Sequence, residues 1–119
     1  MAETLDLGLF PLGIALLPGE RVPLHVFEPR YRQLVADCTL EQRPFVLVLE
    51  TEHGTARVGC AARFETLLRR FADGRMNLVV AGVEPVEILE PSSGSLYRSA
   101  RVRPLPDAPS VPDPALVEK

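Results

Sequence analysis

Twelve prolines and eight glycines divide this chain of 119 residues into short apolar pieces. Short pieces between turn signals are typical of strands, so the spacing of proline and glycine indicates a mostly β domain. The first piece runs from Leu7 to Leu17 and the second from Val22 to Phe27, with Pro18 and Gly19 between them at positions that fit a type II turn. Pro23 makes the second piece an edge strand or the start of a strand, because proline donates no ladder hydrogen bond.

One segment alone has clear helical periodicity. Its apolar residues fall at spacings of three and four, which places them on one helix face; they are Tyr31, Leu34, Val35 and Cys38. Pro29 suits the first turn, where its missing N–H costs no intrahelical hydrogen bond. The apolar pattern stops near Thr39, so we expect one short helix near residues 29–38.

The second half of the chain has the patterns of strands. Phe45 to Leu49 is a solid apolar run, typical of a strand buried on both faces. Val58 to Phe71 alternates, and its expected inward face consists of Cys60, Ala62, Phe64 and Leu68. Asp73 and Gly74 supply a tight hairpin signal, after which Met76, Leu78 and Val80 resume the inward face. A last strand is expected from Leu96 to Val102.

About six strands, one helix and no internal repeat predict a mainly β (α+β) fold, a small twisted β-barrel. Closing a sheet into a barrel removes the exposed edges that favour aggregation. A chain of this length forms one domain. Five of the twelve prolines fall between Pro104 and Pro114. We therefore expect a β domain over residues 1–105 and a Pro-rich, flexible tail over residues 106–119.

The basic residues exclude several activities. The formal net charge is −3, and the only lysine is Lys119, against twelve arginines. A Walker phosphate loop, a Schiff-base enzyme and a Ser-Lys peptidase each need an internal lysine. No apolar stretch reaches membrane-spanning length, and the apolar run from Leu9 to Leu17 lacks the basic flank of a secretion signal. We expect a cytoplasmic protein that does not bind membranes.

The residues with catalytic or metal-binding potential are few and scattered. His25 and His53 are the only histidines, and neither lies in a metal-ligand spacing on a helix. Cys38 and Cys60 fall on expected buried faces, where cysteine is usually inert. The sequence therefore predicts no catalytic residues, no cofactor and no metal, and a cryptic hydrolase or small-molecule-binding domain remains the alternative.

Nucleic acid is not the favoured partner. Arginines cluster near the expected helix and hairpin and could form basic patches; they are Arg30, Arg32, Arg69, Arg70 and Arg75. However, the chain is acidic overall, and aromatic residues that could stack on bases make up only 6% of it. An RNA-binding module therefore remains an alternative.

Several segments together resemble one known family. They are Phe10-Pro11-Leu12, Leu17-Pro18-Gly19, Pro23-Leu24-His25-Val26-Phe27-Glu28-Pro29-Arg30-Tyr31, Gly59-Cys60-Ala61-Ala62 and Asp73-Gly74-Arg75-Met76-Asn77-Leu78 with Gly82 following. In this order they look like the amino-terminal, substrate-binding domain of Lon protease, over residues 7 to about 105. The signature residues, which we expect to be mainly structural, are Pro11, Pro18, Gly19, Phe27, Glu28, Pro29, Arg30, Tyr31, Gly59, Gly74 and Gly82.

The resemblance implies a PUA-like barrel with a helix and a role in polypeptide recognition. It implies no protease activity, because the ATPase and Ser-Lys peptidase modules of Lon do not fit in this chain. The expected partner is unfolded or exposed apolar polypeptide, in a stand-alone or truncated Lon-like domain. A separate protease or chaperone as partner, and self-association, are left open.

The expected polypeptide contact lies at the hairpin tip. Leu68, Phe71 and Met76 are apolar residues close to Arg69, Arg70 and Arg75. Apolar residues ringed by charge suit a protein partner. The alternative is that these three residues simply pack in the barrel.

Overall fold

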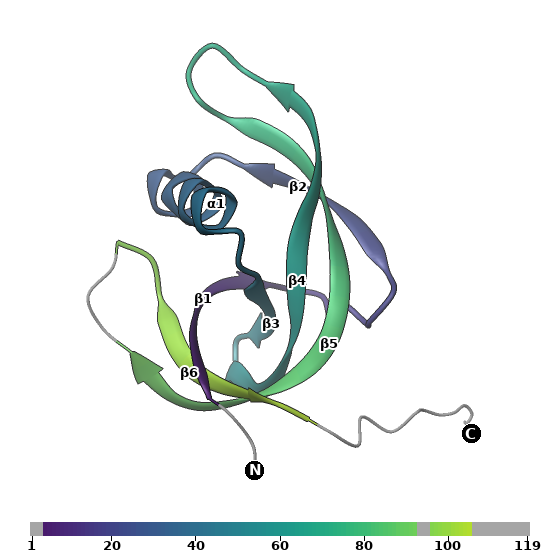
Figure 1. Ribbon diagram of the computed structural model, residues 1–119, viewed down its shortest axis with the longest axis vertical. Helices are drawn as coiled ribbons and strands as arrows, with labels where there is room; N and C mark the ends of the chain where they lie inside the picture. Colours follow the sequence, from purple (N-terminus) through teal and green to yellow (C-terminus); the bar gives the residue numbers. More distant parts are fainter. Residues whose placement is uncertain (1–3, 93–95, 106–119) are drawn as a thin grey trace.

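The fold consists of six strands and one helix (Figure 1). The structure is a computed structural model that describes residues 4–92 and 96–105, so the tail expected over residues 106–119 lies outside the described part. In chain order the elements are β1 (Leu5–Leu12), β2 (Arg21–Val26), α1 (Pro29–Glu41), β3 (Phe45–Thr51), β4 (Gly54–Arg70), β5 (Met76–Ser92) and β6 (Ser99–Pro104). The predicted mainly β, PUA-like twisted barrel is confirmed.

Five of the strands close into a ring. The sheet order is β2-β5-β4-β3-β1-β6, and β6 also pairs with β5. The β1–β3 pair is parallel, and the other pairs are antiparallel. The first part of β5 pairs with β2 and its last part with β6. β2 therefore lies outside the ring as an edge strand, which is one of the two alternatives that Pro23 indicated, and Pro23 pairs there with Val79.

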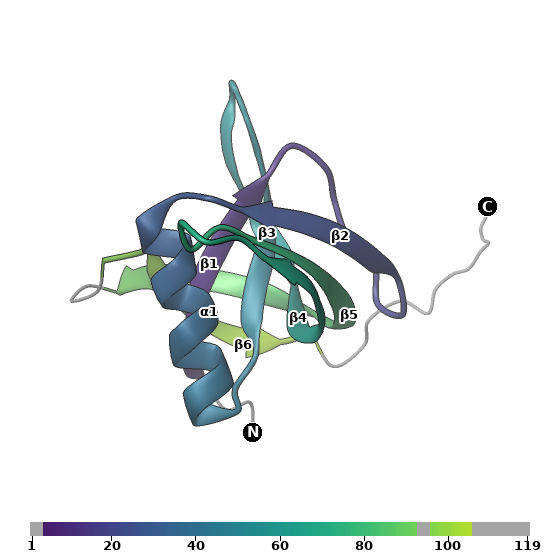
Figure 2. The same cartoon turned by 90° about the horizontal axis from the view of Figure 1, so that it is seen from above.

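Two apolar clusters fill the interior. The larger one joins α1 to the barrel and contains the whole predicted helix stripe, Tyr31, Leu34, Val35 and Cys38, all buried. The smaller one lies between β1, β3, β4, β5 and β6. Figure 2 shows α1 standing beside the barrel, and the apolar face of the helix packs in the larger cluster. Among the described residues, no helix has the length and apolar character needed to cross a membrane.

The helix begins at Pro29 as predicted, but it is longer than predicted. It continues to Glu41 and ends at Gln42, which has the left-handed φ of 54° and whose backbone N–H donates to the carbonyl of Cys38. The last turn, Thr39 to Glu41, is exposed. Apolar periodicity cannot reveal a turn that buries nothing, so the expected end at residue 38 was too early.

The end of β4 and the start of β5 extend beyond the ring as an arm, residues 63–81, with β2 paired along its β5 side (Figure 1). The tip of the arm contacts α1 through Arg32, which donates to the Asp73 carbonyl. Its predicted turn is confirmed, since Gly74 has a φ of 96° and its N–H donates to the carbonyl of Phe71. The expected inward position of Leu68 is wrong, because this side chain is exposed. The register of β4 against β5 shifts between Phe64 and Thr66 and again between Leu67 and Arg69, so simple alternation fails there.

One further expectation needs correction. The last strand begins at Ser99 and not at Leu96, because Tyr97 is buried and its hydroxyl donates to the Asp37 carboxylate of α1 at 2.6 Å. The signature residue Phe27 is half exposed and stacks on His25, with 5.8 Å between the ring centroids. It follows β2 directly, at the edge of the sheet.

Several signature residues that are distant in sequence meet in space. The turn that contains Pro18 and Gly19 lies on Gly82 of β5: the Gly19 N–H donates to the Gly82 carbonyl at 2.9 Å, and the Gly82 N–H donates to the Glu20 carbonyl at 2.8 Å. A β-carbon on Gly82 would lie 2.5 Å from the carbonyl oxygen of Leu17. This close approach explains why glycine is required at position 82.

Candidate functional site

A groove separates the helix from the arm. We call it the arm groove; its main part has a volume of about 570 Å³ and is lined by Arg32, Val35, Ala36, Thr39, Leu40, Arg70, Gly74 and Met76. A smaller hollow of about 200 Å³ adjoins it and shares Val35, Thr39, Arg70 and Met76, adding Phe64 to Leu67 and Leu78. A third hollow, of about 320 Å³, continues past Thr39 to Arg43 and Arg63.

The strand pairing leaves this groove open. β4 pairs with β3 only through residues 54–62, whereas its pairing with β5 continues to Arg70. Within the described residues, the second edge of β4 from Arg63 onward therefore has no strand partner. Helix α1 lies along this edge at a distance, because Val35 and Thr39 line the same hollow as Phe64 and Leu67.

The groove has an apolar floor and exposed apolar walls. Met76 is only 5% exposed and belongs to the core cluster, so it forms part of the floor. Leu40, in the last turn of α1, is 83% exposed, and Leu67 on β4 is 48% exposed. Large apolar side chains that border a concave surface are a usual mark of a binding site.

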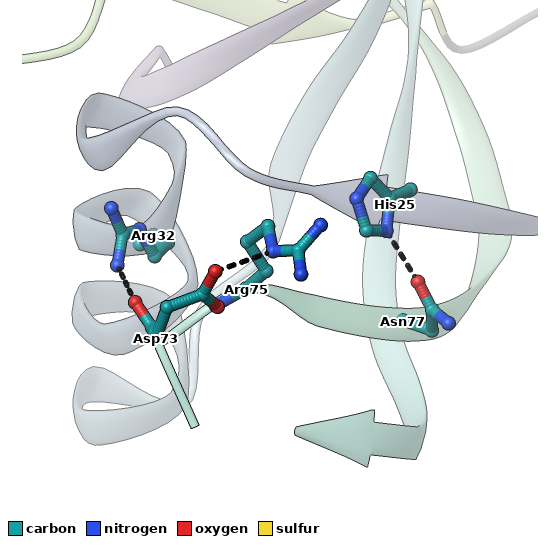
Figure 3. A network of polar contacts seen from close by, with 5 residues as sticks. All are labelled: His25, Arg32, Asp73, Arg75 and Asn77. Atoms are coloured by element: carbon teal, nitrogen blue, oxygen red, sulfur yellow. Dashed lines mark hydrogen bonds and ion pairs between the residues drawn. The ribbon is translucent and has the colours of Figure 1, made fainter. Parts of the chain in front are cut away.

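The arm tip is fastened to the helix by a small polar network (Figure 3). Arg32 of α1 donates from Nη1 to the backbone carbonyl of Asp73 at 2.9 Å, and Arg75 donates from Nε to the Asp73 carboxylate at 2.8 Å. The backbone N–H of Arg75, and then its guanidinium, hold the pKa of Asp73 below its ordinary value. A β-carbon on Gly74 would collide with the Arg32 guanidinium, so glycine lets the turn lie flat on this side chain.

The opposite side of the arm carries a second surface, which we call the outer face: His25, Phe27, Arg69, Phe71 and Arg75. His25 contacts the Asn77 amide oxygen at 2.5 Å (Figure 3) and lies edge-on to Phe71. The guanidinium carbons of Arg69 and Arg75 lie 4.6 and 4.8 Å from the centre of the Phe71 ring. Such cation–π contacts hold the two arginines over the ring.

The three residues expected to contact polypeptide do not form one surface. Met76 is buried in the floor of the arm groove, Phe71 is half-buried on the outer face, and Leu68 is exposed at a bulge of β4. The alternative expectation, that these residues pack in the barrel, is therefore met by Met76 alone of the three. Sequence reasoning missed Leu40 and Leu67, whose common position depends on how the arm lies against α1.

The residues with catalytic potential do not form a reactive group. Among the described residues, no three His, Cys, Asp or Glu side chains are placed to hold a metal ion. Cys38 and Cys60 are buried free thiols in the core. Burial raises the pKa of Cys38 to about 11 and also raises the pKa of Cys60, so both are protonated at neutral pH.

These pKa shifts predict slow thiol chemistry in the folded protein. At pH 8, a rise in the pKa of Cys38 from 9.0 to about 11 lowers its thiolate fraction about 100-fold. We expect Cys38 to react with Ellman's reagent at least that much more slowly in the folded protein than in guanidinium chloride, and Cys60 also to react more slowly when folded. The shift is upward, so its contribution to stability is present below about pH 9 and is lost as the pH rises through about 11. Fast labelling of the folded protein at pH 8 would contradict this assignment.

Comparisons with known proteins agree with this architecture. Residues 6–119 match the family model described as "ATP-dependent protease La (LON) substrate-binding domain". Among solved structures, the chain is similar to a Lon N-terminal domain protein from Xanthomonas campestris, with 28% identity and a TM-score of 0.74 over 93% of this chain and 66% of that one. It also shares its fold with the N-terminal domain of a Mycobacterium avium complex Lon protease, at 20% identity and a TM-score of 0.71 over 89% of this chain and 57% of that one. The chain thus spans less than two thirds of either structure.

Proposed function

Because this chain belongs to the ATP-dependent protease La (LON) substrate-binding domain family, we propose that it is a non-enzymatic polypeptide-recognition domain. Its ligand is an exposed apolar segment of an unfolded or partly unfolded protein, and its binding site is the arm groove. The observation that carries the proposal is the pair of exposed leucines, Leu40 and Leu67, which border a groove floored by Met76.

The physical basis is the burial of apolar surface. Covering apolar area contributes about 25 cal/mol per Å², so two leucines and the groove floor favour an apolar ligand. The open edge of β4 also leaves room for an extended chain beside the arm. A domain of this kind supplies recognition alone, and we propose that a separate cytoplasmic protease or chaperone acts on what it holds.

The double substitution Leu40→Gln and Leu67→Thr tests the groove. Both residues are exposed, so the fold is retained, and we expect affinity for a chemically unfolded, alkylated protein to fall about tenfold as the apolar contact is lost. Binding is measured by fluorescence anisotropy of the labelled unfolded protein, and thermal unfolding confirms that the variant is folded.

The matched control is the double substitution Ile14→Gln and Val83→Thr. These residues are also exposed apolar side chains, at 59% and 46%, but they line none of the three hollows of the groove. The control is expected to bind like the unmodified protein. If both double variants lose affinity equally, binding is nonspecific and the arm groove is not the site.

RNA binding is the second candidate, and the outer face favours it. Phe27 offers a half-exposed ring, and Arg69 and Arg75 lie over Phe71, an arrangement that suits bases and phosphates. A salt titration separates the two functions. RNA affinity would fall by about three orders of magnitude between roughly 50 and 200 mM salt, whereas apolar polypeptide binding changes little. A steep fall, made shallower by about one contact's worth of slope in Arg69→Met, would favour RNA.

A further inference from the structure

The charges around the arm groove are unbalanced, although the chain as a whole has a net charge of −3. Four arginines line its three hollows: Arg32, Arg43, Arg63 and Arg70. The only acidic residue in that lining is Glu65. The groove is therefore a basic strip on an acidic protein.

Several of these charged side chains already form ion pairs or hydrogen bonds within the protein. The Glu65 carboxylate accepts from Nε of Arg21 at 2.6 Å, which lowers the pKa of Glu65, and Arg43 lies 2.9 Å from the Glu41 carboxylate. Arg32 is held by the backbone carbonyl of Asp73. Within the described residues, Arg63 and Arg70 form no ion pair and are exposed, so they are the two available cations.

Arg63 and Arg70 lie at opposite ends of the apolar wall. Both belong to β4, with Phe64 and Leu67 between them on the groove side. At about 3.3 Å per residue, the seven steps from Arg63 to Arg70 span about 23 Å, a length that an extended segment of about seven residues matches. An occupant that fits the whole groove has apolar side chains in its centre and negative charge at its ends.

We propose that the arm groove selects extended apolar segments flanked by aspartate or glutamate side chains, with the flanking carboxylates paired to Arg63 and Arg70. This inference rests on the proposed function, because it names the class of polypeptide that the same groove takes. The guanidinium forks match carboxylates in shape and charge. Segments flanked by lysine or arginine are disfavoured by repulsion at both ends, so the groove discriminates among apolar segments.

The test uses two labelled ten-residue peptides with the same apolar centre, one flanked by glutamates and one by glutamines, both with amidated ends. In about 50 mM salt we expect the glutamate peptide to bind about fivefold more tightly, since exposed ion pairs contribute modestly. At about 0.5 M salt screening reduces the preference below about twofold. The double variant Arg63→Met and Arg70→Met loses the preference but keeps its affinity for the glutamine peptide.

The control variant is Arg57→Met with Arg69→Met. It removes the same two charges from exposed arginines that form no ion pair within the described residues and line no part of the groove. It is expected to keep the full preference; an equal loss in both variants would show that net charge alone attracts the peptide and would overturn the proposal.

Two further outcomes separate this proposal from the one on which it rests. Equal affinity for both peptides, with unfolded protein still bound, overturns acidic selection and leaves polypeptide recognition intact. If neither the peptides nor the unfolded protein bind, acidic selection and polypeptide recognition are both overturned.

A third peptide, with glutamine flanks and a free terminal carboxylate, tests the other source of this charge. If it binds as tightly as the glutamate peptide, the groove recognises the C-terminal carboxylate of a polypeptide, and the proposed selection of acidic side chains is wrong.

Discussion

Replacement of Gly82 by alanine is expected to lower the free energy of unfolding by about 2–3 kcal/mol. The added methyl group would lie 2.5 Å from the backbone oxygen of Leu17 and 3.1 Å from Sγ of Cys60. A backbone atom cannot move aside as a flexible side chain can, so the turn must lift away. Lifting it weakens the two backbone hydrogen bonds that join Gly82 to Gly19 and Glu20.

The measurement is thermal or denaturant unfolding followed by circular dichroism. At about 4 °C per kcal/mol, the expected fall in melting temperature is about 8–12 °C. The matched control is Gly13→Ala, because a β-carbon at Gly13 meets no atom within 4 Å and its φ is not positive. This control is expected to be neutral or slightly stabilising. Equal stability of the two variants would show that the turn does not constrain position 82.

Local patterns were sufficient to predict the elements that bury one regular face. Helix α1 was predictable because its apolar stripe from Tyr31 to Cys38 is buried. The arm turn was predictable because an Asp-Gly pair favours a tight hairpin turn, in which glycine adopts a positive φ. The predictions failed where exposure or irregularity breaks the pattern. The last turn of α1 buries nothing, and the bulges of β4 place Leu68 in solvent although its spacing suggests the core.

The candidate site was less predictable than the fold, for a topological reason. Leu40 and Leu67 come from separate elements, and their common groove exists only because β3 stops pairing with β4 at Ala62. No spacing in the sequence encodes that stop. The arginine cluster was visible in the sequence, but the distribution of its members between two surfaces was not. Arg70 lines the arm groove, whereas Arg69 lies over Phe71 on the outer face.

The largest loss of stability is expected from Phe45→Ala, about 3–5 kcal/mol, because the ring is completely buried. Phe45 stacks on Phe64 with 4.3 Å between the ring centroids, and it meets Phe10 edge-on at 6.4 Å. Phe10 in turn lies 4.5 Å from Tyr31 of α1. This row of rings joins β4 to the helix through β3 and β1, so its loss leaves a cavity at the centre of the larger cluster.

The companion substitutions distinguish packing from a general effect of losing an aromatic ring. Phe45→Leu fills most of the cavity and is expected to cost about 1–2 kcal/mol. Phe27→Ala removes a ring that is 55% exposed and is expected to cost less than about 1 kcal/mol. Urea unfolding of the three variants gives the order, and equal losses for Phe45→Ala and Phe27→Ala would contradict it. Phe64 lines the arm groove, and Tyr31 is a core residue of α1, the helix that forms the opposite wall. Phe45→Leu is therefore also expected to weaken peptide binding more than its small loss of stability explains. The core under the groove sets the distance between its walls, and binding therefore depends on a residue that no ligand touches.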